Sequence, residues 1–367
     1  MNTTSLEQSC TILTVDLAHI ATNWKRLAER VAPAECTAVV KANAYGLGVA
    51  PVARALFAAG SRTFFVANLA EAIALREILP TATIGVFNGL LPHCEKEYQH
   101  FQLLPVLNHL AEVERWHCYA KKCGRKLPAF LHIDTGMNRL GLDPFEVAQL
   151  RSSPHKLEGI AIAAYLSHFA CADIPQHPLT AEQAQRFSLA RQGLPAAAAS
   201  LCNSSGIFCS KKYHLNLVRP GCALYGLNPI PTTTNPMKPV VRWQGRILQL
   251  RDVPLGETIG YGASYCAHRP LRLATVAAGY ADGLLRPLHS RIQVAIGTYY
   301  APIIGRISMD MITVDVTDIP CEAIHLGDFV DLLNDSLTID ELAIASGTIG
   351  YEIITALGRR CTRRYME

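Results

Sequence analysis

Polar and charged side chains follow a series of short apolar runs between residues 37 and 222. Lys41, for example, comes directly after Ala-Val-Val, and His168 follows an apolar run that ends at Leu166. If these runs are strands of one parallel barrel, their carboxyl ends meet at one mouth, where barrel enzymes carry out their chemistry. The residues at these positions are Lys41, Asn68, Asp134, His168, Asn203, Ser204 and Arg219, with Arg139 in the loop after Asp134.

A lysine surrounded by other cations could act as a nucleophile. Desolvation and the charges of Arg139 and Arg219 would lower the pKa of Lys41, and a neutral lysine amine can form an imine with a carbonyl group. The polar turns 203–206 (NSSG) and 219–222 (RPGC) can present hydroxyl and backbone N–H groups to a phosphate. Each feature alone has an ordinary structural explanation, but together they are the arrangement that pyridoxal 5′-phosphate requires.

Short apolar runs alternate with amphipathic stretches through this region, which predicts repeated strand–helix units and a parallel sheet. Helices are expected over 17–32, 49–59, 69–79, 110–122 and 181–191. Strands are expected at 37–40, 63–66, 83–87, 102–106, 129–133, 159–166, 197–201 and 215–218. Eight such units in about 200 residues predict a (β/α)8 TIM barrel. An open doubly wound sheet is the alternative, although no G-x-G-x-x-G motif follows the first strand.

The pattern changes at the Pro- and Thr-rich segment 231–239, which reads as a linker. Runs at 246–251, 271–277, 291–295, 311–316 and 329–333, separated by Gly, Pro and Asp, predict a smaller β-rich module with one helix near 338–345. We therefore expect two domains, a barrel at 1–235 and a β-rich C-terminal domain at 236–367. Residues 10–16 are candidates for pairing with the second domain.

Composition narrows the class of protein. Of the 367 residues, 50% are hydrophobic and 17% are charged, which indicates a globular chain, and no apolar stretch is long enough to span a membrane. The net charge of +4 does not indicate a nucleic-acid surface. The twelve cysteines include no C-x-x-C pair, so no metal site is expected. Reduced thiols and the absence of a signal peptide predict a cytoplasmic location.

Nine segments in both predicted domains resemble the alanine racemase family, in family order. The segments are 38–48 (AVVKANAYGLG), 134–141 (DTGMNRLG), 167–170 (SHFA), 203–204 (NS), 218–221 (VRPG), 260–265 (GYGASY), 279–283 (GYADG), 305–310 (GRISMD) and 350–352 (GYE). The resemblance implies a barrel followed by a β-rich domain, pyridoxal 5′-phosphate as cofactor, and a homodimer with shared active sites. It also implies a role in supplying D-alanine for bacterial peptidoglycan.

The resemblance also implies roles for individual residues. Lys41 would form the Schiff base with the cofactor, and Lys41 and Tyr265 would be the two catalytic bases on opposite faces of the substrate. Because a tyrosine is a poor base at neutral pH, Tyr265 needs neighbours that favour its phenolate. The remaining cofactor-binding residues would be Tyr45, His168, Asn203, Ser204, Arg219, Gly221 and Tyr351. The substrate-binding residues would be Arg139, Tyr280, Met309 and Asp310, with Tyr265, Met309 and Asp310 coming from the partner chain.

Two residues carry further expectations. Arg219 would face the pyridine nitrogen, and a guanidinium does not donate its proton as a carboxylic acid would, so side reactions such as transamination should be limited. His132 stands where many members of the family have a carbamylated lysine that steadies the arginine matching Arg139. A neutral histidine can orient Arg139 by one hydrogen bond but supplies no negative charge, so activity should not depend on bicarbonate.

The leading interpretation is a racemase that acts on alanine. Serine is the nearest competing substrate, because a pocket that fits a methyl group rejects an added hydroxyl by only about 100-fold. A protein that merely stores or delivers pyridoxal phosphate would need Lys41 but no second base. Another barrel enzyme with a Schiff-base lysine, such as an aldolase or a decarboxylase, would not explain the resemblance in the second domain.

Overall fold

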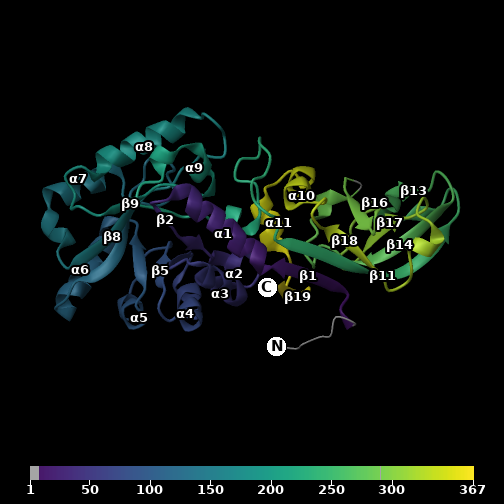
Figure 1. Ribbon diagram of the computed structural model, residues 1–367, viewed down its shortest axis with the longest axis horizontal. Coiled ribbons are helices and arrows are strands. Elements are labelled where there is room, and N and C mark those ends of the chain that lie inside the picture. The colour runs from purple at the N-terminus through teal and green to yellow at the C-terminus, as the bar shows by residue number, and fades with distance from the viewer. Residues whose placement is uncertain (1–7, 290) are drawn as a thin grey trace. The chain divides into compact units, whose positions relative to one another are not determined.

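The computed structural model describes residues 8–289 and 291–367 (Figure 1). These residues form two compact units. The barrel unit comprises Ile20–Ala44 and Gly48–Lys238. The β-rich unit comprises Pro239–Glu367, the described residues up to His19, and the short segment Tyr45–Leu47.

The barrel unit contains a seven-stranded parallel sheet in the order β3-β4-β5-β6-β7-β8-β9 and a separate parallel pair, β2 and β10. Its strands are β2 (Glu35–Cys36), β3 (Ala38–Val39), β4 (Thr63–Val66), β5 (Thr83–Val86), β6 (Leu104–Leu107), β7 (Leu127–His132), β8 (Ile160–Leu166), β9 (Ala198–Ser200) and β10 (Leu217–Val218). The pair of β2 and β10 closes the sheet. On one side, β2 is followed directly by β3 in the chain; on the other, backbone hydrogen bonds from Asn216 to Ala199 and from Arg219 to Cys202 join the segment around β10 to the segment around β9. The predicted (β/α)8 barrel is confirmed.

Helices alternate with these strands along the chain. They are α1 (Leu17–Val31), α2 (Lys41–Tyr45), α3 (Val49–Ala59), α4 (Leu69–Ile78), α5 (Glu95–His100), α6 (Leu110–Cys123), α7 (Pro144–Ser152), α8 (Pro178–Arg191) and α9 (Ser204–Cys209). Local sequence sets several of their starts. Asp143 and Glu146 form a reciprocal capping box on α7, and the Asn68 side chain accepts the Glu71 N–H at the start of α4.

Burial explains why the strands could be recognised from their composition. All residues of β4, Thr-Phe-Phe-Val, are buried, as expected for a parallel strand covered on both faces. The expected strand at 37–40 is instead interrupted at Thr37, whose backbone N–H and hydroxyl both donate to the Val218 carbonyl, at 3.1 and 2.8 Å. The interruption therefore lies where the barrel closes onto β10.

The β-rich unit contains an eight-stranded sheet in the order β14-β17-β16-β15-β18-β11-β1-β19, and β14 also pairs with β11, which closes a ring. Its strands are β1 (Thr11–Asp16), β11 (Val241–Val253), β14 (Leu271–Ala277), β15 (Gln293–Ile296), β16 (Tyr299–Ile304), β17 (Ile312–Asp315), β18 (Phe329–Leu333) and β19 (Thr362–Met366). A two-stranded hairpin, β12 (Thr258–Ile259) and β13 (Tyr265–Cys266), and helices α10 (Ile339–Ser346) and α11 (Gly350–Ala356) complete the unit. Strand β1 pairs antiparallel with β11 and parallel with β19.

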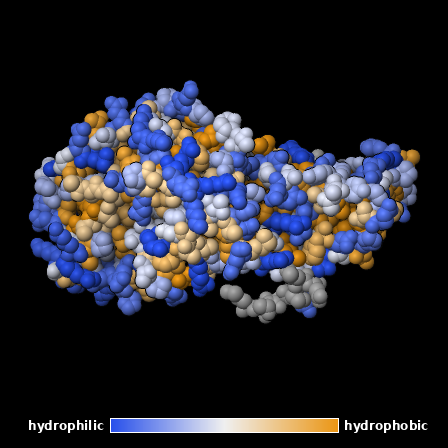
Figure 2. Space-filling view, in the orientation of Figure 1, coloured by the Kyte–Doolittle hydropathy of each residue, from blue (hydrophilic) through white to orange (hydrophobic). Residues whose placement is uncertain are grey.

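The surface carries a mixture of hydrophilic and hydrophobic residues, as the overall composition predicts. On the face that Figure 2 shows, hydrophilic residues are interspersed with hydrophobic ones. Within the described part of the chain, no helix combines the length and the apolar character needed to cross a membrane.

Candidate active site

Lys41 begins a short turn of left-handed helix at the carboxyl end of β3. The four residues after it, Ala42, Asn43, Ala44 and Tyr45, all have positive φ angles, between 52° and 55°. This conformation costs an L-residue about 1–2 kcal/mol, so four in succession persist only where surrounding contacts hold them. The backbone directly after Lys41 is therefore a strained segment.

Hydrogen bonds at both ends of the turn hold it in place. At its start, the N–H of Ala44 donates to the carbonyl of Val40 at 2.9 Å. At its end, Asn43 accepts twice, with its carbonyl from Gly48 N–H at 2.9 Å and with its side-chain oxygen from Val49 N–H at 2.8 Å. Asn43 thus links the turn to the beginning of α3.

Glu71, on α4, is a third anchor. Its Oε1 accepts the N–H of Ala42 at 2.7 Å, and its Oε2 accepts the N–H of Ala67 at 2.8 Å. One carboxylate therefore holds the loops that follow two neighbouring strands, β3 and β4.

Lys41 is suited to covalent chemistry. Its side chain is open to solvent at the barrel mouth, but nearby protein atoms partly desolvate the ammonium group. This desolvation is the main cause of a lowered pKa, the charge of Arg139 lowers it further, and the charge of Glu71 opposes the shift. The neutral amine is thus more populated than in a free lysine.

Arg219 is buried beneath the mouth, with 4% of its surface exposed. One terminal nitrogen donates to the Ser200 hydroxyl and the other to the Ser167 carbonyl. Burial lowers its pKa to about 10, which leaves the guanidinium charged at neutral pH. Its Nε–H has no partner among the described residues, and no carboxylate pairs with it there, so an acceptor from a bound molecule would relieve an unsatisfied donor.

Ser204 lies at the start of α9, after β9, and is also buried. Its hydroxyl oxygen accepts two backbone N–H groups, from Gly221 at 2.9 Å and from Ala223 at 3.2 Å. A serine hydroxyl has two acceptor sites and one donor, so its hydrogen remains available for an anion. Asn203 caps α9 through its side-chain oxygen, which accepts the Gly206 N–H at 2.9 Å.

Two histidines lie close to the same cations. Burial, followed by the charge of Arg219, lowers the pKa of His168 well below its usual value. The same two causes, in the same order, lower the pKa of His132 to about 4. Both rings are therefore neutral at physiological pH. The Asn203 amide nitrogen lies 3.4 Å from Nε2 of His168, which places this ring beside the start of α9.

The remaining predicted site residues belong to the β-rich unit. The rings of Tyr45 and Tyr351 have centroids 6.0 Å apart and an interplanar angle of 40°. Backbone bonds from Tyr280 to Ser308 and from Ala281 to Met309 hold two loops side by side. A β-carbon on Gly279 would approach the Met309 carbonyl oxygen to 2.2 Å, so only glycine fits between these loops. The side chains of Tyr280 and Met309 are both exposed.

Asp310 follows Met309, and its carboxylate accepts a hydrogen bond from Arg360 at 2.6 Å. Arg360 also lies 3.6 Å from the buried carboxylate of Asp282, which in turn accepts the Gly279 N–H at 3.0 Å. The loops that carry Tyr280 and Asp310 are thus connected by one arginine between two carboxylates.

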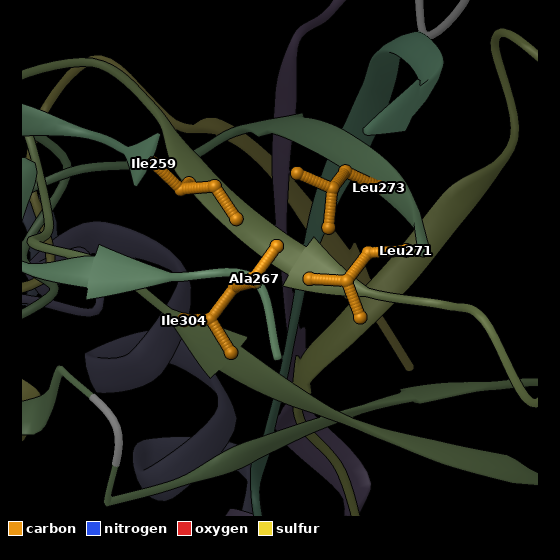
Figure 3. Close-up of a cluster of buried hydrophobic side chains, with 5 residues drawn as sticks. All are labelled: Ile259, Ala267, Leu271, Leu273 and Ile304. Carbon is orange, nitrogen blue, oxygen red and sulfur yellow. The ribbon is translucent and has the colours of Figure 1, made fainter. Parts of the chain in front are cut away.

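Tyr265, the predicted second base, lies at the start of β13. Its partly buried ring packs against an apolar cluster formed by Ile259, Ala267, Leu271, Leu273 and Ile304, whose five members are drawn in Figure 3. Backbone pairing of Ile259 with Tyr265 connects the hairpin to this cluster. The cluster therefore supports the ring, while the ring itself is only partly covered.

The barrel residues fit pyridoxal 5′-phosphate by the chemistry of their donors. Lys41 provides an amine with a lowered pKa, Ser204 provides a free hydroxyl hydrogen, and Arg219 provides an unsatisfied buried N–H. An aldehyde, a phosphate and a ring nitrogen are suitable partners for these three groups.

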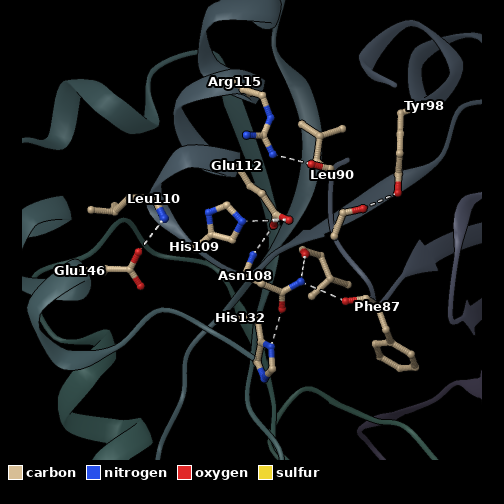
Figure 4. Close-up of polar contacts among 12 residues, drawn as sticks. Phe87, Leu90, Tyr98, Asn108, His109, Leu110, Glu112, Arg115, His132 and Glu146 are labelled. Carbon is tan, nitrogen blue, oxygen red and sulfur yellow. Dashed lines mark hydrogen bonds and ion pairs between the residues drawn. The ribbon is translucent and has the colours of Figure 1, made fainter. Parts of the chain in front are cut away.

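Several residues that position the site were not singled out from the sequence. The buried side chain of Asn108, directly after β6, contacts His132, and Glu112 accepts the Asn108 backbone N–H (Figure 4). Asn108 follows Leu-Pro-Val-Leu, so the rule that identified Lys41 would also have found it. Glu71 has no comparable signal, because glutamate in the first turn of a helix is common.

Two family models cover nearly the whole chain. "Alanine racemase, N-terminal domain" matches residues 15–229, and "Alanine racemase, C-terminal domain" matches residues 240–365. The chain is 48% identical over 355 residues to the alanine racemase of Methylobacterium nodulans, which covers 97% of this chain and 96% of that relative. It is 44% identical over 361 residues to the alanine racemase of Rhodospirillum rubrum, and the match covers 98% of this chain and 96% of that relative.

Solved structures agree. The alanine racemase of Bartonella henselae with covalently bound pyridoxal phosphate superposes with a TM-score of 0.94 at 39% identity, covering 98% of this chain and 100% of that one. The biosynthetic enzyme of Pseudomonas aeruginosa gives a TM-score of 0.87 at 37% identity, with the same coverage. The chain belongs to the alanine racemase family of pyridoxal-phosphate-dependent isomerases.

Proposed function

We propose that this enzyme interconverts L-alanine and D-alanine with Lys41 and Tyr265 as its two bases. The observation that carries the proposal is the group of cations at the barrel mouth, where Lys41 has a lowered pKa and Arg219 has an unsatisfied buried donor. Family membership supports the choice of racemisation over carriage of the cofactor or another Schiff-base reaction.

Seven residues besides Lys41 would hold the cofactor through its phosphate and ring. These are Tyr45, Ser204, Gly221 and Tyr351 around the phosphate, and His168, Asn203 and Arg219 around the ring. When bound, the cofactor supplies a conjugated ring system that delocalises the electron pair left at the substrate Cα. Because Arg219 stays charged without being an effective acid, it would donate a hydrogen bond to the ring nitrogen and leave that nitrogen unprotonated.

The chain's own side chains would move the proton. Lys41 Nζ would hold or release the Cα proton on one face, and the Tyr265 hydroxyl would do so on the other, so that inversion needs no rotation of the substrate. Arg139 would bind the substrate carboxylate, and Tyr280, Met309 and Asp310 would limit the space for the substrate side chain. A methyl group fits such a crowded site best, which favours alanine over serine.

Three wider aspects of the proposal follow from the family. A homodimer would form, in which Tyr265, Met309 and Asp310 of one chain complete the site of its partner. The enzyme would act in the cytoplasm and supply D-alanine for peptidoglycan. A catabolic role is the second candidate, because the chain is 46% identical to "Alanine racemase, catabolic" of Mesorhizobium japonicum. Rescue of a D-alanine-requiring bacterium without induction by alanine would favour the biosynthetic role.

The decisive test is purified protein incubated with L-alanine and, in parallel, with L-serine, with the D-isomers measured by a coupled oxidase. Borohydride reduction followed by peptide mapping would show whether the cofactor is attached to Lys41. We expect D-alanine to form faster than D-serine and the label to lie on Lys41. Bound cofactor without formation of D-alanine would overturn the racemase proposal.

Tyr265→Phe separates a racemase from a cofactor carrier. A racemase that uses Tyr265 as a base would lose turnover in at least one direction, typically 10²–10⁴-fold. A carrier would bind and release pyridoxal phosphate as before. Tyr261→Phe is a matched control, because Tyr261 lies on the same hairpin loop with 72% of its surface exposed.

A further inference from the structure

Asn108 follows β6 at the barrel mouth and has a fixed side-chain orientation. Its amide nitrogen donates to two backbone carbonyls, of Phe87 at 3.0 Å and of Val106 at 2.8 Å. Rotating the amide by 180° would place its oxygen against both carbonyl oxygens, which is unfavourable. The amide oxygen must therefore face the other way, toward His132 (Figure 4).

This orientation determines which nitrogen of His132 carries the proton. Nδ1 of His132 lies 2.8 Å from the Asn108 amide oxygen, which can only accept a hydrogen bond. Nδ1 must therefore donate. Nε2, on the opposite side of the ring, makes no hydrogen bond to any described residue.

The ring carries only one proton at neutral pH. Burial lowers the pKa of His132 to about 4, the charges of Arg219 and Arg139 act in the same direction, and the charge of Asp134 opposes them. With the single proton on Nδ1, Nε2 presents a lone pair.

A buried network fixes Asn108 from behind. Glu112, on α6, accepts the Asn108 backbone N–H at 2.6 Å. Gly89 has a positive φ of 81° and packs against both residues, so that a β-carbon there would lie 2.3 Å from the Glu112 carboxylate and 2.8 Å from the Asn108 amide nitrogen. The Asn108 side chain therefore has little freedom to rotate.

We propose that Asn108 is a positioning residue that holds His132 in the Nδ1–H tautomer, so that Nε2 accepts a hydrogen bond from the guanidinium of Arg139. Arg139 is close enough to act on the titration of His132, Lys41 and His168, and it makes no hydrogen bond or ion pair with any described residue. Its donors are therefore available. The inference rests on the proposed function, in which Arg139 binds the substrate carboxylate.

In this tautomer, Arg139 donates to a neutral acceptor, Nε2 of His132. A charged acceptor would bind the guanidinium more strongly. A neutral Nε2 orients the guanidinium without neutralising it, so Arg139 keeps its full positive charge for the substrate. The opposite tautomer would direct an N–H group at Arg139, which has only donors.

The tautomer can be measured directly in the holoenzyme. In protein labelled with nitrogen-15 histidine, a long-range proton–nitrogen correlation spectrum distinguishes Nδ1–H from Nε2–H. The signals of His132 are assigned as those that disappear in the His132→Gln variant. Two other histidines serve as references. His117 places Nδ1 2.7 Å from the Glu158 carbonyl, and His214 places Nε2 3.0 Å from the Ile207 carbonyl. We expect His132 to resemble His117, and an Nε2–H or doubly protonated ring would overturn the proposal.

Asn108→Leu removes the acceptor. We expect the His132 signals to become those of a tautomer mixture, and the KM for L-alanine to rise about three- to tenfold with a smaller change in kcat. His117→Gln is the control, because half-buried His117 lies on α6 and contacts the Glu158 carbonyl instead of His132, and it should leave both constants unchanged. An unchanged tautomer and an unchanged KM in Asn108→Leu would contradict the role of Asn108.

If Asn108→Leu fails to fold, the spectrum of the wild-type holoenzyme still decides, because it reports the tautomer of His132 by itself. Failure of the proposed function is a separate outcome. It would appear as absence of D-alanine with wild-type enzyme, whereas the tautomer is read without turnover.

Discussion

The Glu71 carboxylate accepts the backbone N–H of Ala42 at 2.7 Å, one residue after Lys41. A side chain on α4 thus anchors the strained turn on which the reactive lysine lies. Because the second oxygen of Glu71 accepts the N–H of Ala67, the anchor itself is held in place.

Glu71→Gln should weaken this anchor. An amide has only one oxygen, so one of the two backbone N–H groups would lose its acceptor, at a cost of about 1–3 kcal/mol. We expect a lower free energy of unfolding in urea and a lower kcat/KM. Glu77→Gln is the matched control, because Glu77 is exposed on the same helix. Equal stability of the two variants would exclude the anchoring role.

The charge of Glu71 also affects Lys41. Glu71 raises the pKa of Lys41 and Arg139 lowers it. Removing the charge of Glu71 should therefore lower the pKa of Lys41, and removing the charge of Arg139 should raise it. Cofactor binding to Lys41 requires the neutral amine, so its rate rises as pH increases through the pKa of Lys41. Stopped-flow measurement with apoenzyme should place the midpoint at lower pH in Glu71→Gln and at higher pH in Arg139→Gln. Shifts of the same sign would contradict this electrostatic account.

The left-handed turn predicts an unusual response to glycine. Ala42→Gly should raise the free energy of unfolding by about 0.5–1 kcal/mol, because relief of left-handed strain exceeds the entropy cost of glycine. Ala55→Gly, in the middle of α3, should lower the free energy of unfolding by a similar amount. Denaturant titration of both variants measures this reversal of sign. Destabilisation by Ala42→Gly would show that the turn is not strained.

Bicarbonate should have no effect on activity. His132 cannot carry the carbamate that a lysine would at this position, and its low pKa leaves it neutral. Enzyme assayed in buffer freed of carbon dioxide should turn over at the same rate before and after bicarbonate is added. A loss of rate that bicarbonate restores would require another carbamylated lysine.

Arg219→Glu should increase transamination. A carboxylic acid can protonate the ring nitrogen of the cofactor, whereas a guanidinium does not, and a protonated ring delocalises more of the electron pair. We expect pyruvate to accumulate during incubation with alanine, measured with lactate dehydrogenase. Arg219→Lys tests whether loss of the buried guanidinium alone has this effect. If neither variant forms pyruvate, the proposed role of Arg219 is wrong.

The barrel could be predicted because its strands are short, mostly buried and separated by helices. Strand ends then indicated Lys41, His168 and Arg219, since a parallel sheet brings its carboxyl ends together. The left-handed turn could not be predicted, because Ala42, Ala44 and Tyr45 have no preference for positive φ. Its conformation depends on acceptors such as Glu71, which lies far away in the sequence.

The second module was harder to predict in detail. Strand β16 begins with two exposed tyrosines, Tyr299 and Tyr300, and ends with two buried isoleucines, so its residues do not alternate regularly between exposed and buried. The hairpin of β12 and β13 pairs only two residues on each side, too few for a period-two pattern. Tyr265 was therefore found by resemblance, and its apolar support became visible only in the structure.

Strand β1 pairs with both β11 and β19, so residues near the two ends of the chain belong to one sheet. During synthesis, β1 is translated before the barrel, and the whole barrel must be translated before either partner of β1 exists. Deleting β1 would expose an edge of β11 and an edge of β19 at once. We therefore expect the loss of either β1 or β19 to destabilise this sheet, and the pairing of β1 is complete only after β19 has been translated.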